Sequence, residues 1–181
     1  MFASGDIVRE IPLIEKLARN NESDDNRFRA HLKGKLNLST VATDLIVKET
    51  TEQVWQHIDC RDCANCCKKL PVVVDNADIN RLSKRLNISI KEFTHRYTHV
   101  TEHGEKQFKT TPCPLLGTDN LCTVYEDRPK ACTEFPYLYE KHFTSRSITM
   151  LCNTEVCPIV FNVWKELKFR LGYTKSKVTK R

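Results

Sequence analysis

The stretch Cys60-Arg-Asp-Cys63-Ala-Asn-Cys66-Cys67 places four thiols within eight consecutive positions. Three of them follow the spacing C-x-x-C-x-x-C, which lets one tight loop or helical turn direct its sulfurs at a single centre. The spacing is typical of zinc knuckles and of iron–sulfur loops alike. Packing of a hydrophobic core gives no reason to gather four thiols so closely. The stretch therefore predicts a metal centre around which the rest of the fold is organised.

The adjacent pair Cys66 and Cys67 makes a site with a single small ion less simple. Neighbouring side chains leave a helix about 100° apart and leave a strand on opposite faces. We therefore expect the two sulfurs to diverge. The two thiols would then bind two different metals, or one would bind a cluster while the other lies next to its ligands without binding it.

The remaining five cysteines are distant from the cluster in sequence, as expected of ligands recruited by a fold-closing metal site: Cys113, Cys122, Cys132, Cys152 and Cys157. Cys157 stands at the beginning of a predicted helix, where free N–H groups and the positive end of the helix dipole stabilise a thiolate. Cys152 lies outside that turn, and we expect it to be left over.

The composition favours metal ligation over disulfides. The cysteine count is odd, at nine, and the first sixteen residues lack the basic, apolar and small-residue order of a secretory signal. We therefore expect a reducing, cytoplasmic environment in which thiols stay free. No apolar window is long enough for a membrane span.

The formal charge of +6 raises the question of nucleic acid. Eight thiolates with two zinc ions would add −8 and +4, leaving about +2. The excess of lysine and arginine would thus partly balance the negative charge of the thiolates at the metal site. We expect the basic residues of the last helix and tail to form a solvated face, and we expect neither a nucleic-acid partner nor a membrane partner.

Hydrophobic patterning predicts an α+β fold: a small, mainly helical domain with short strands and loops around a cysteine-ligated metal centre. Residues 1–38 are expected to form a flexible or partly helical arm, 39–172 the metal-binding domain, and 173–181 a basic disordered tail. Helices are expected after four capping residues: Ser39, Asp75 or Asn76, Ser89 and Asn153. Strands are expected at 70–74, 121–125 and 145–151, with a hairpin at 100–109.

Several motifs accompany the cluster: Leu70-Pro-Val-Val-Val-Asp75, Asp78-Ile79, Cys122-Thr-Val-Tyr125-Glu-Asp-Arg128-Pro129-Lys-Ala-Cys132-Thr-Glu-Phe135-Pro136 and Cys157-Pro158. Together they resemble the CxxCxxCC cysteine-cluster family, also called YkgJ-like, which is described as a zinc- or iron-chelating domain with eight characteristic cysteines. The resemblance spans about Cys60 to Pro158. It implies eight metal ligands, with Cys152 the extra cysteine: Cys60, Cys63, Cys66, Cys67, Cys113, Cys122, Cys132 and Cys157.

Tyr125 and Arg128 fall between two of these cysteines. We expect Arg128 to support the site by donating hydrogen bonds to thiolates or loop carbonyls and by offsetting their charge, and we expect Tyr125 to lie outside the metal ligands in a similar supporting role. This expectation rests partly on the resemblance.

The sequence does not decide between zinc and an iron–sulfur cluster, for which a 4Fe-4S cubane is one form. The count of eight thiols suits two four-thiolate zinc sites. The C-x-x-C-x-x-C run suits three corners of a cubane, and this spacing slightly favours an iron–sulfur cluster. The centre would have a redox role, or it would be a structural zinc clip in a protein-interaction module. Domains of this type also resemble part of the flagellin lysine N-methylases. Because the chain has no cofactor-binding glycine motif, methyl transfer is the weakest of these hypotheses.

Overall fold

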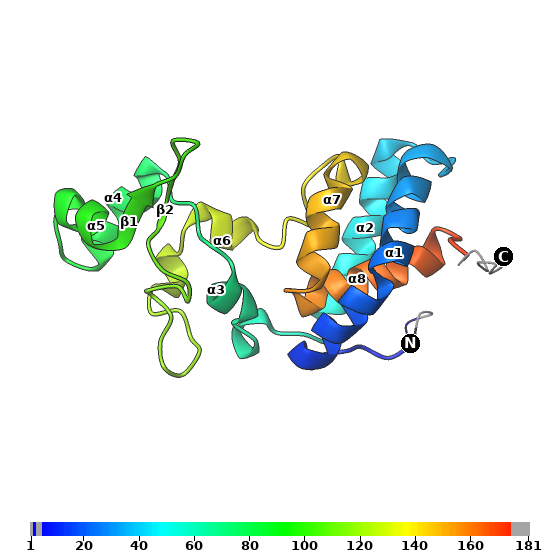
Figure 1. Cartoon of the computed structure of the whole chain (residues 1–181), viewed down its shortest axis with the longest axis horizontal. Coiled ribbons are helices and arrows are strands. Elements are labelled where there is room, and N and C mark those ends of the chain that lie inside the picture. The colour runs from blue at the N-terminus through cyan, green and yellow to red at the C-terminus, as the bar shows by residue number, and fades with distance from the viewer. Residues whose placement is uncertain (1, 3–4, 175–181) are drawn as a thin grey trace. The chain divides into compact units, whose positions relative to one another are not determined.

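The structure is a computed structural model that describes residues 2 and 5–174. Its contacts divide the chain into a helical unit, Met1–Asp59 with Pro136–Arg181, and a cysteine unit, Cys60–Phe135 (Figure 1). The predicted domain 39–172 is thus divided between both units, and most of the predicted tail, 175–181, lies outside the described residues. The described part is mostly helical with one small sheet, which agrees with the α+β prediction. None of its helices has the length and apolar character needed to cross a membrane.

The helical unit contains four helices that pack through buried apolar side chains: α1 (Ile11–Gly34), α2 (Thr40–Trp55), α7 (Phe143–Thr154) and α8 (Pro158–Arg170). Most of the predicted N-terminal arm is the continuous helix α1. Its side chains Ile14, Ala18, Phe28 and Leu32 are buried. These residues recur at helical spacing, so the arm contributes one face to the core of the unit.

A polar contact explains why α1 continues through the polar stretch in its middle. Lys168 Nζ on α8 lies 2.7 Å from Asp24 Oδ2 and also pairs with Asp25, while Trp164 Nε1 donates to Asp25 Oδ1 at 3.0 Å. Burial raises the pKa of Asp25, and the contacts with Lys168 and Trp164 oppose that shift. Both carboxylates are buried with partners, so they anchor α1 to α8 in the segment that the sequence predicted as a flexible or partly helical arm.

The predicted start of α2 is confirmed, and that of α8 is wrong. Ser39 caps α2, since its hydroxyl accepts from the amide of Ala42. Asn153 does not cap α8, because α7 continues through it and α8 begins at Pro158 with Cys157 as its N-cap. Proline is favoured in the first helical turn, where its missing N–H costs no hydrogen bond.

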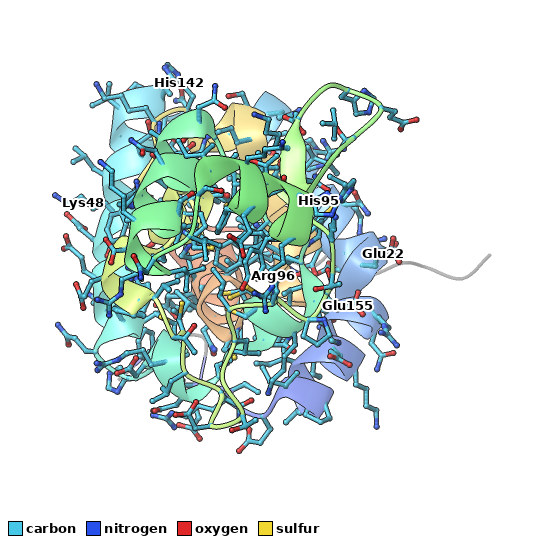
Figure 2. All side chains as sticks on the ribbon, turned by 90° about the vertical axis from the view of Figure 1, so that its left-hand side faces the viewer. Glu22, Lys48, His95, Arg96, His142 and Glu155 are labelled. Atoms are coloured by element: carbon cyan, nitrogen blue, oxygen red, sulfur yellow. The ribbon has the colours of Figure 1, made fainter. Side chains whose placement is uncertain are left out.

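The strand predicted at 145–151 is also wrong, because the segment belongs to α7. The helix begins after His142, whose side chain, like that of Lys48 on α2, projects from the ribbon in Figure 2. The side chain of Asp44 accepts from the amides of His142 at 2.8 Å and Phe143 at 3.0 Å. A residue of α2 therefore caps α7, which is a long-range contact that local patterning does not contain.

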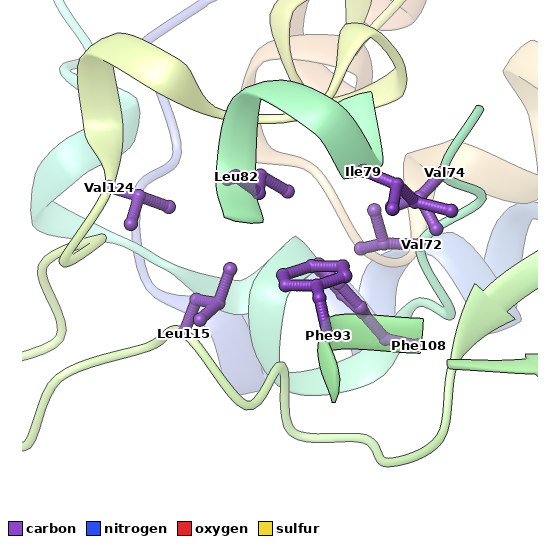
Figure 3. Close-up of a cluster of buried hydrophobic side chains, with 8 residues drawn as sticks. All are labelled: Val72, Val74, Ile79, Leu82, Phe93, Phe108, Leu115 and Val124. Carbon is purple, nitrogen blue, oxygen red and sulfur yellow. The ribbon is translucent and has the colours of Figure 1, made fainter. Parts of the chain in front are cut away.

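The cysteine unit consists of short elements around one apolar cluster (Figure 3). They are η1 (Cys60–Asp62), α3 (Asn65–Lys69), α4 (Asn76–Arg85), α5 (Ile90–Tyr97), β1 (Thr98–Val100), β2 (Lys106–Phe108), η2 (Tyr125–Asp127) and α6 (Lys130–Glu134). The predicted helices α4 and α5 are confirmed. Asp75 and Asp78 form a capping box at the start of α4, and Ser89 caps α5.

The strands predicted at 70–74 and 121–125 are wrong, whereas the hairpin predicted at 100–109 is confirmed. Strands β1 and β2 pair antiparallel, with Thr98 opposite Phe108. The other two segments contribute one isolated bridge each, Val73 with Gln107 and Leu116 with Cys122. Val72 and Val74 are buried in the apolar cluster, so their β-branched character reflects core packing in an irregular segment.

Candidate metal centre

Seven of the nine cysteines lie in the cysteine unit, and the helical unit holds the other two. Cys152 is exposed on α7, and Cys157 is buried at the N-cap of α8. All nine are thiols rather than disulfides in the structure. That Cys152 is not a metal ligand and that Cys157 is one both stay predictions.

The first two cysteines of the cluster, Cys60 and Cys63, lie in a tight turn. The amides of Cys63 and Ala64 both donate to the carbonyl of Cys60, at 3.2 and 3.3 Å, and Ala64 adopts a left-handed conformation with φ of 49°. The chain then enters α3, and the amide of Asn65 donates to Cys63 Sγ at 3.4 Å. The turn thus directs a backbone N–H at a sulfur, an arrangement that stabilises a thiolate.

The adjacent cysteines do not diverge as expected. Cys66 Sγ and Cys67 Sγ lie 3.9 Å apart on α3. Although their Cα–Cβ bonds leave the helix in different directions, rotation about χ1 brings the two sulfurs back within reach. The pKa of Cys67 is lowered to about 7, chiefly by its hydrogen bond with Cys66, and burial opposes this shift.

A hairpin-like loop brings Cys113 and Cys122 together. The amide of Thr123 donates to the carbonyl of Leu115 at 3.0 Å, and Leu116 and Cys122 form a β-bridge. The amide of Cys113 also donates to the carbonyl of Cys67 at 2.8 Å, which joins this loop to α3. Two segments far apart in sequence therefore meet at Cys67.

The bend of this loop leaves little room for a side chain at Gly117. A Cβ at Gly117 would lie 2.6 Å from Asp119 Oδ1 and 3.1 Å from the carbonyl oxygen of Leu121. Gly117→Ala is therefore expected to destabilise the metal-free protein by about 1–3 kcal/mol, as overpacking does elsewhere. Chemical unfolding followed by circular dichroism measures the change. Gly34→Ala is the matched control, because nothing lies within 4 Å of a Cβ there; an equal loss of stability in both variants would contradict the steric explanation.

Cys132 lies on the short helix α6, which begins directly after Pro129. Its pKa is raised to about 12, chiefly by burial and also by the charges of Cys67, Cys113 and Cys122. Burial likewise raises the pKa of Cys113 to about 11, again with contributions from Cys67 and Cys122. These four thiols, from α3, the loop that carries Cys113 and Cys122, and α6, therefore interact electrostatically. We call Cys67, Cys113, Cys122 and Cys132 the thiol quartet.

Backbone amides approach the quartet in a repeated pattern. The amides of Leu115 and Val124 each donate to the sulfur two residues earlier, of Cys113 and Cys122, and so lower pKa values that burial raises. The amide of Asn65 stands in the same relation to Cys63. A neutral thiol is a weak acceptor, so three such contacts favour the thiolate form that metals bind.

Two cations face these sulfurs. Lys68 lowers the pKa of Cys63 and Cys67 through its charge, and Arg128 does so for Cys122 and Cys132, although burial is a larger influence than the cation at each of the four thiols. The Arg128 guanidinium lies 4.0 Å from the centre of the Tyr125 ring and donates to the Tyr125 carbonyl at 3.3 Å. Tyr125 thus holds Arg128, and the support that both residues would give to a bound metal stays a prediction.

The structure groups the quartet without forming a coordination sphere. Within residues 2 and 5–174, no three cysteine, histidine, aspartate or glutamate side chains are gathered closely enough to hold a metal ion. The donor chemistry nevertheless fits a soft or borderline cation. Buried thiolates that repel one another become favourable only when a cation balances them.

Sequence reasoning missed Asp78 and Arg81 as parts of this region. Asp78 was read only as one position of a family motif, but its carboxylate accepts from the amide of Lys130, 52 residues away, at 3.0 Å. Arg81 donates to the carbonyl oxygens of Asp127 and Arg128. The only available signal was an acidic residue at the third position of a predicted helix, and that signal indicates helix capping alone.

The comparisons with known proteins agree with these observations. No solved structure is significantly similar to this chain. A family model matches residues 59–158, which is more than half of the chain and includes every cysteine discussed above. The family is described as "Putative zinc- or iron-chelating domain". The chain therefore belongs to the CxxCxxCC family of metal-chelating domains.

Proposed function

We propose that the cysteine unit binds zinc through the thiol quartet and that this zinc is a structural clip. The proposal rests on one observation above all: four half-buried thiols from α3, the 113–123 loop and α6 lie close enough together for the charge of Cys67 to raise the pKa values of the other three. Four thiolates around one ion are the usual ligands of a closed structural zinc site. The remaining cysteines of the cluster, Cys60, Cys63 and Cys66, are the proposed ligands of a second metal.

Charge balance supports a divalent ion at the quartet. Four thiolates and one divalent cation leave two negative charges, and Lys68 and Arg128 supply two positive ones. The quartet without a metal keeps most of its protons, since the pKa values of Cys113 and Cys132 are about 11 and about 12. Zinc would replace those protons and let the chain bury the sulfurs as thiolates.

The small size of the cysteine unit supports a structural role. Its apolar core consists of eight side chains, among them Leu82 and Phe93. Units of roughly 70–80 residues seldom gain enough stability from one apolar core and commonly add a metal or disulfides. A metal that joins α3 to the 113–123 loop and to α6 would supply such a connection.

Zinc binding is expected to release protons, so affinity should rise with pH. At pH 8, Cys113, Cys122 and Cys132 hold their protons because their pKa values lie above 9, while Cys67, with a pKa of about 7, has mostly lost its own. Binding should then release about three protons, and the affinity should rise about a thousandfold per pH unit near pH 8. Competition with a chelator at pH 7.5–8.5 measures this slope, and a pH-independent affinity would contradict the quartet as the site.

Metal analysis tests the proposal directly. Protein purified without oxygen should contain stoichiometric zinc and be colourless. An iron–sulfur cluster is the second candidate, because Cys60, Cys63 and Cys66 follow the cluster-binding spacing and the first two share one tight turn that leads into α3. Iron and sulfide with a broad visible absorption would favour it, and a reversible colour change on reduction would support a redox role. If the purified protein contains neither zinc nor iron above trace level, the zinc site and the iron–sulfur cluster are both refuted.

A further inference from the structure

The chain between Cys122 and Cys132 is held by two side chains of α4. Arg81 Nε donates to the carbonyl oxygen of Asp127 at 3.1 Å, and Arg81 Nη2 donates to that of Arg128 at 2.9 Å. Asp78 Oδ1 accepts from the amide of Lys130 at 3.0 Å. Three successive anchor points, at residues 127, 128 and 130, thus lie immediately before Cys132.

The two side chains are fixed with respect to each other. Arg81 Nη2 lies 2.7 Å from Asp78 Oδ1, and Asp78 retains 2% of its exposed surface. Asp78 Oδ2 accepts from the amide of Asp75 at 3.1 Å, while Asp75 Oδ1 accepts from that of Asp78. One buried carboxylate therefore caps α4, orients Arg81 and receives the first amide of α6. A charged, hydrogen-bonded group of this kind holds its partners in one geometry.

We infer that Asp78 and Arg81 are positioning residues for the metal centre. They hold residues 127–130 so that Cys132 stays in the thiol quartet and the guanidinium of Arg128 stays over Tyr125. This inference rests on the proposed function. We call the pair the α4 latch. Helix capping alone would need only the bonds between Asp75 and Asp78. The fork of Arg81 across two carbonyl oxygens serves no part of α4, and its effect falls on the segment that carries Cys132.

Arginine is required for the latch because its guanidinium presents donors in a fixed plane. In Arg81→Lys the positive charge remains, but one ammonium cannot reproduce the fork. We expect zinc affinity to fall by about 10- to 100-fold, as is typical when groups that orient metal ligands are removed. Arg85→Lys is the matched control. Arg85 lies one turn further along α4 and pairs at 3.5 Å with the side chain of Asp127, not with its carbonyl oxygen.

The experiment compares the full-length wild type, Arg81→Lys and Arg85→Lys, each loaded with zinc or with cobalt(II). Zinc affinity comes from chelator competition, and the sulfur-to-cobalt charge-transfer band reports the number of bound thiolates. Alkylation of the zinc-loaded proteins, followed by mass spectrometry, gives the rates at Cys132 and Cys113. In Arg81→Lys we expect weaker zinc binding, a weaker cobalt band and faster alkylation of Cys132 alone. If the substitution instead destabilised the whole cysteine unit, Cys132 and Cys113 would both be alkylated faster.

The outcomes separate the latch from the proposed function. If Arg81→Lys keeps the zinc affinity, the cobalt band and the protection of Cys132, the latch is refuted and the zinc site stands. If Cys132 and Cys113 become reactive together, or if Arg85→Lys behaves like Arg81→Lys, the positioning role is likewise refuted. A wild type that gives no thiolate–cobalt band refutes the zinc site and the latch with it.

Discussion

Cys132→Ser is expected to weaken zinc binding by more than the roughly 10–100-fold that follows loss of a group outside the coordination sphere. The hydroxyl of serine is a poor zinc ligand at neutral pH, and Cys132 is the quartet member whose pKa is raised furthest, to about 12. At a zinc concentration 100 times the wild-type Kd, a ligand stabilises its protein by about 2.7 kcal/mol. Most of that stabilisation should disappear. Chelator competition and chemical unfolding with and without zinc measure both effects.

Cys152→Ser is the control for this experiment. Cys152 is exposed on α7, in the helical unit, whereas Cys132 lies in the cysteine unit. Its replacement should leave zinc content, affinity and stability unchanged. Equal losses in Cys132→Ser and Cys152→Ser would show that the quartet is not the site.

Cys157→Ser tests the predicted eighth ligand. Cys157 is the N-cap of α8, and serine is a favoured residue at that position. The substitution should therefore preserve or slightly increase the stability of the helical unit. A loss of metal in this variant would then identify Cys157 as a ligand, and full retention would remove it from the set of eight.

Phe28→Ala is expected to cost the helical unit about 3–5 kcal/mol, the usual loss when a fully buried phenylalanine is truncated. Phe28 is 0% exposed and packs edge-on against Trp164 with ring centres 5.1 Å apart. Both tryptophans, Trp55 and Trp164, belong to the helical unit, so tryptophan fluorescence during chemical unfolding reports that unit alone. The midpoint should fall sharply, because the cavity is lined by aromatic rings that cannot collapse around it.

The cysteine unit should be insensitive to the same substitution, because its apolar cluster contains no residue of the helical unit. The thiolate–cobalt band should therefore keep its wild-type intensity in Phe28→Ala under native conditions. Phe169→Ala, at an α8 position that is 60% exposed, is the matched control and should leave the fluorescence midpoint nearly unchanged. Simultaneous loss of both signals in Phe28→Ala would show that the units unfold as one.

Local signals predicted those elements whose ends are set by neighbouring residues. Ser39, Asp75 and Ser89 cap helices as expected, because a cap joins a side chain to an amide three residues away. The strands expected at 70–74 and 121–125 are absent because strand formation depends on residues distant in sequence. A strand requires a partner, and in this fold those segments find one bridge each.

The sequence by itself determined that this chain is a cysteine-cluster protein of a metal-chelating family, since four thiols in eight positions and the later motifs are local facts. Only the tertiary structure decided which thiols interact. It separated Cys157 from the other seven by unit, and it joined Cys67 to Cys113, Cys122 and Cys132. The physical reason is that such contacts arise from loop closure and burial between distant segments, which depend on the whole chain and leave no mark in the spacing of the cysteines.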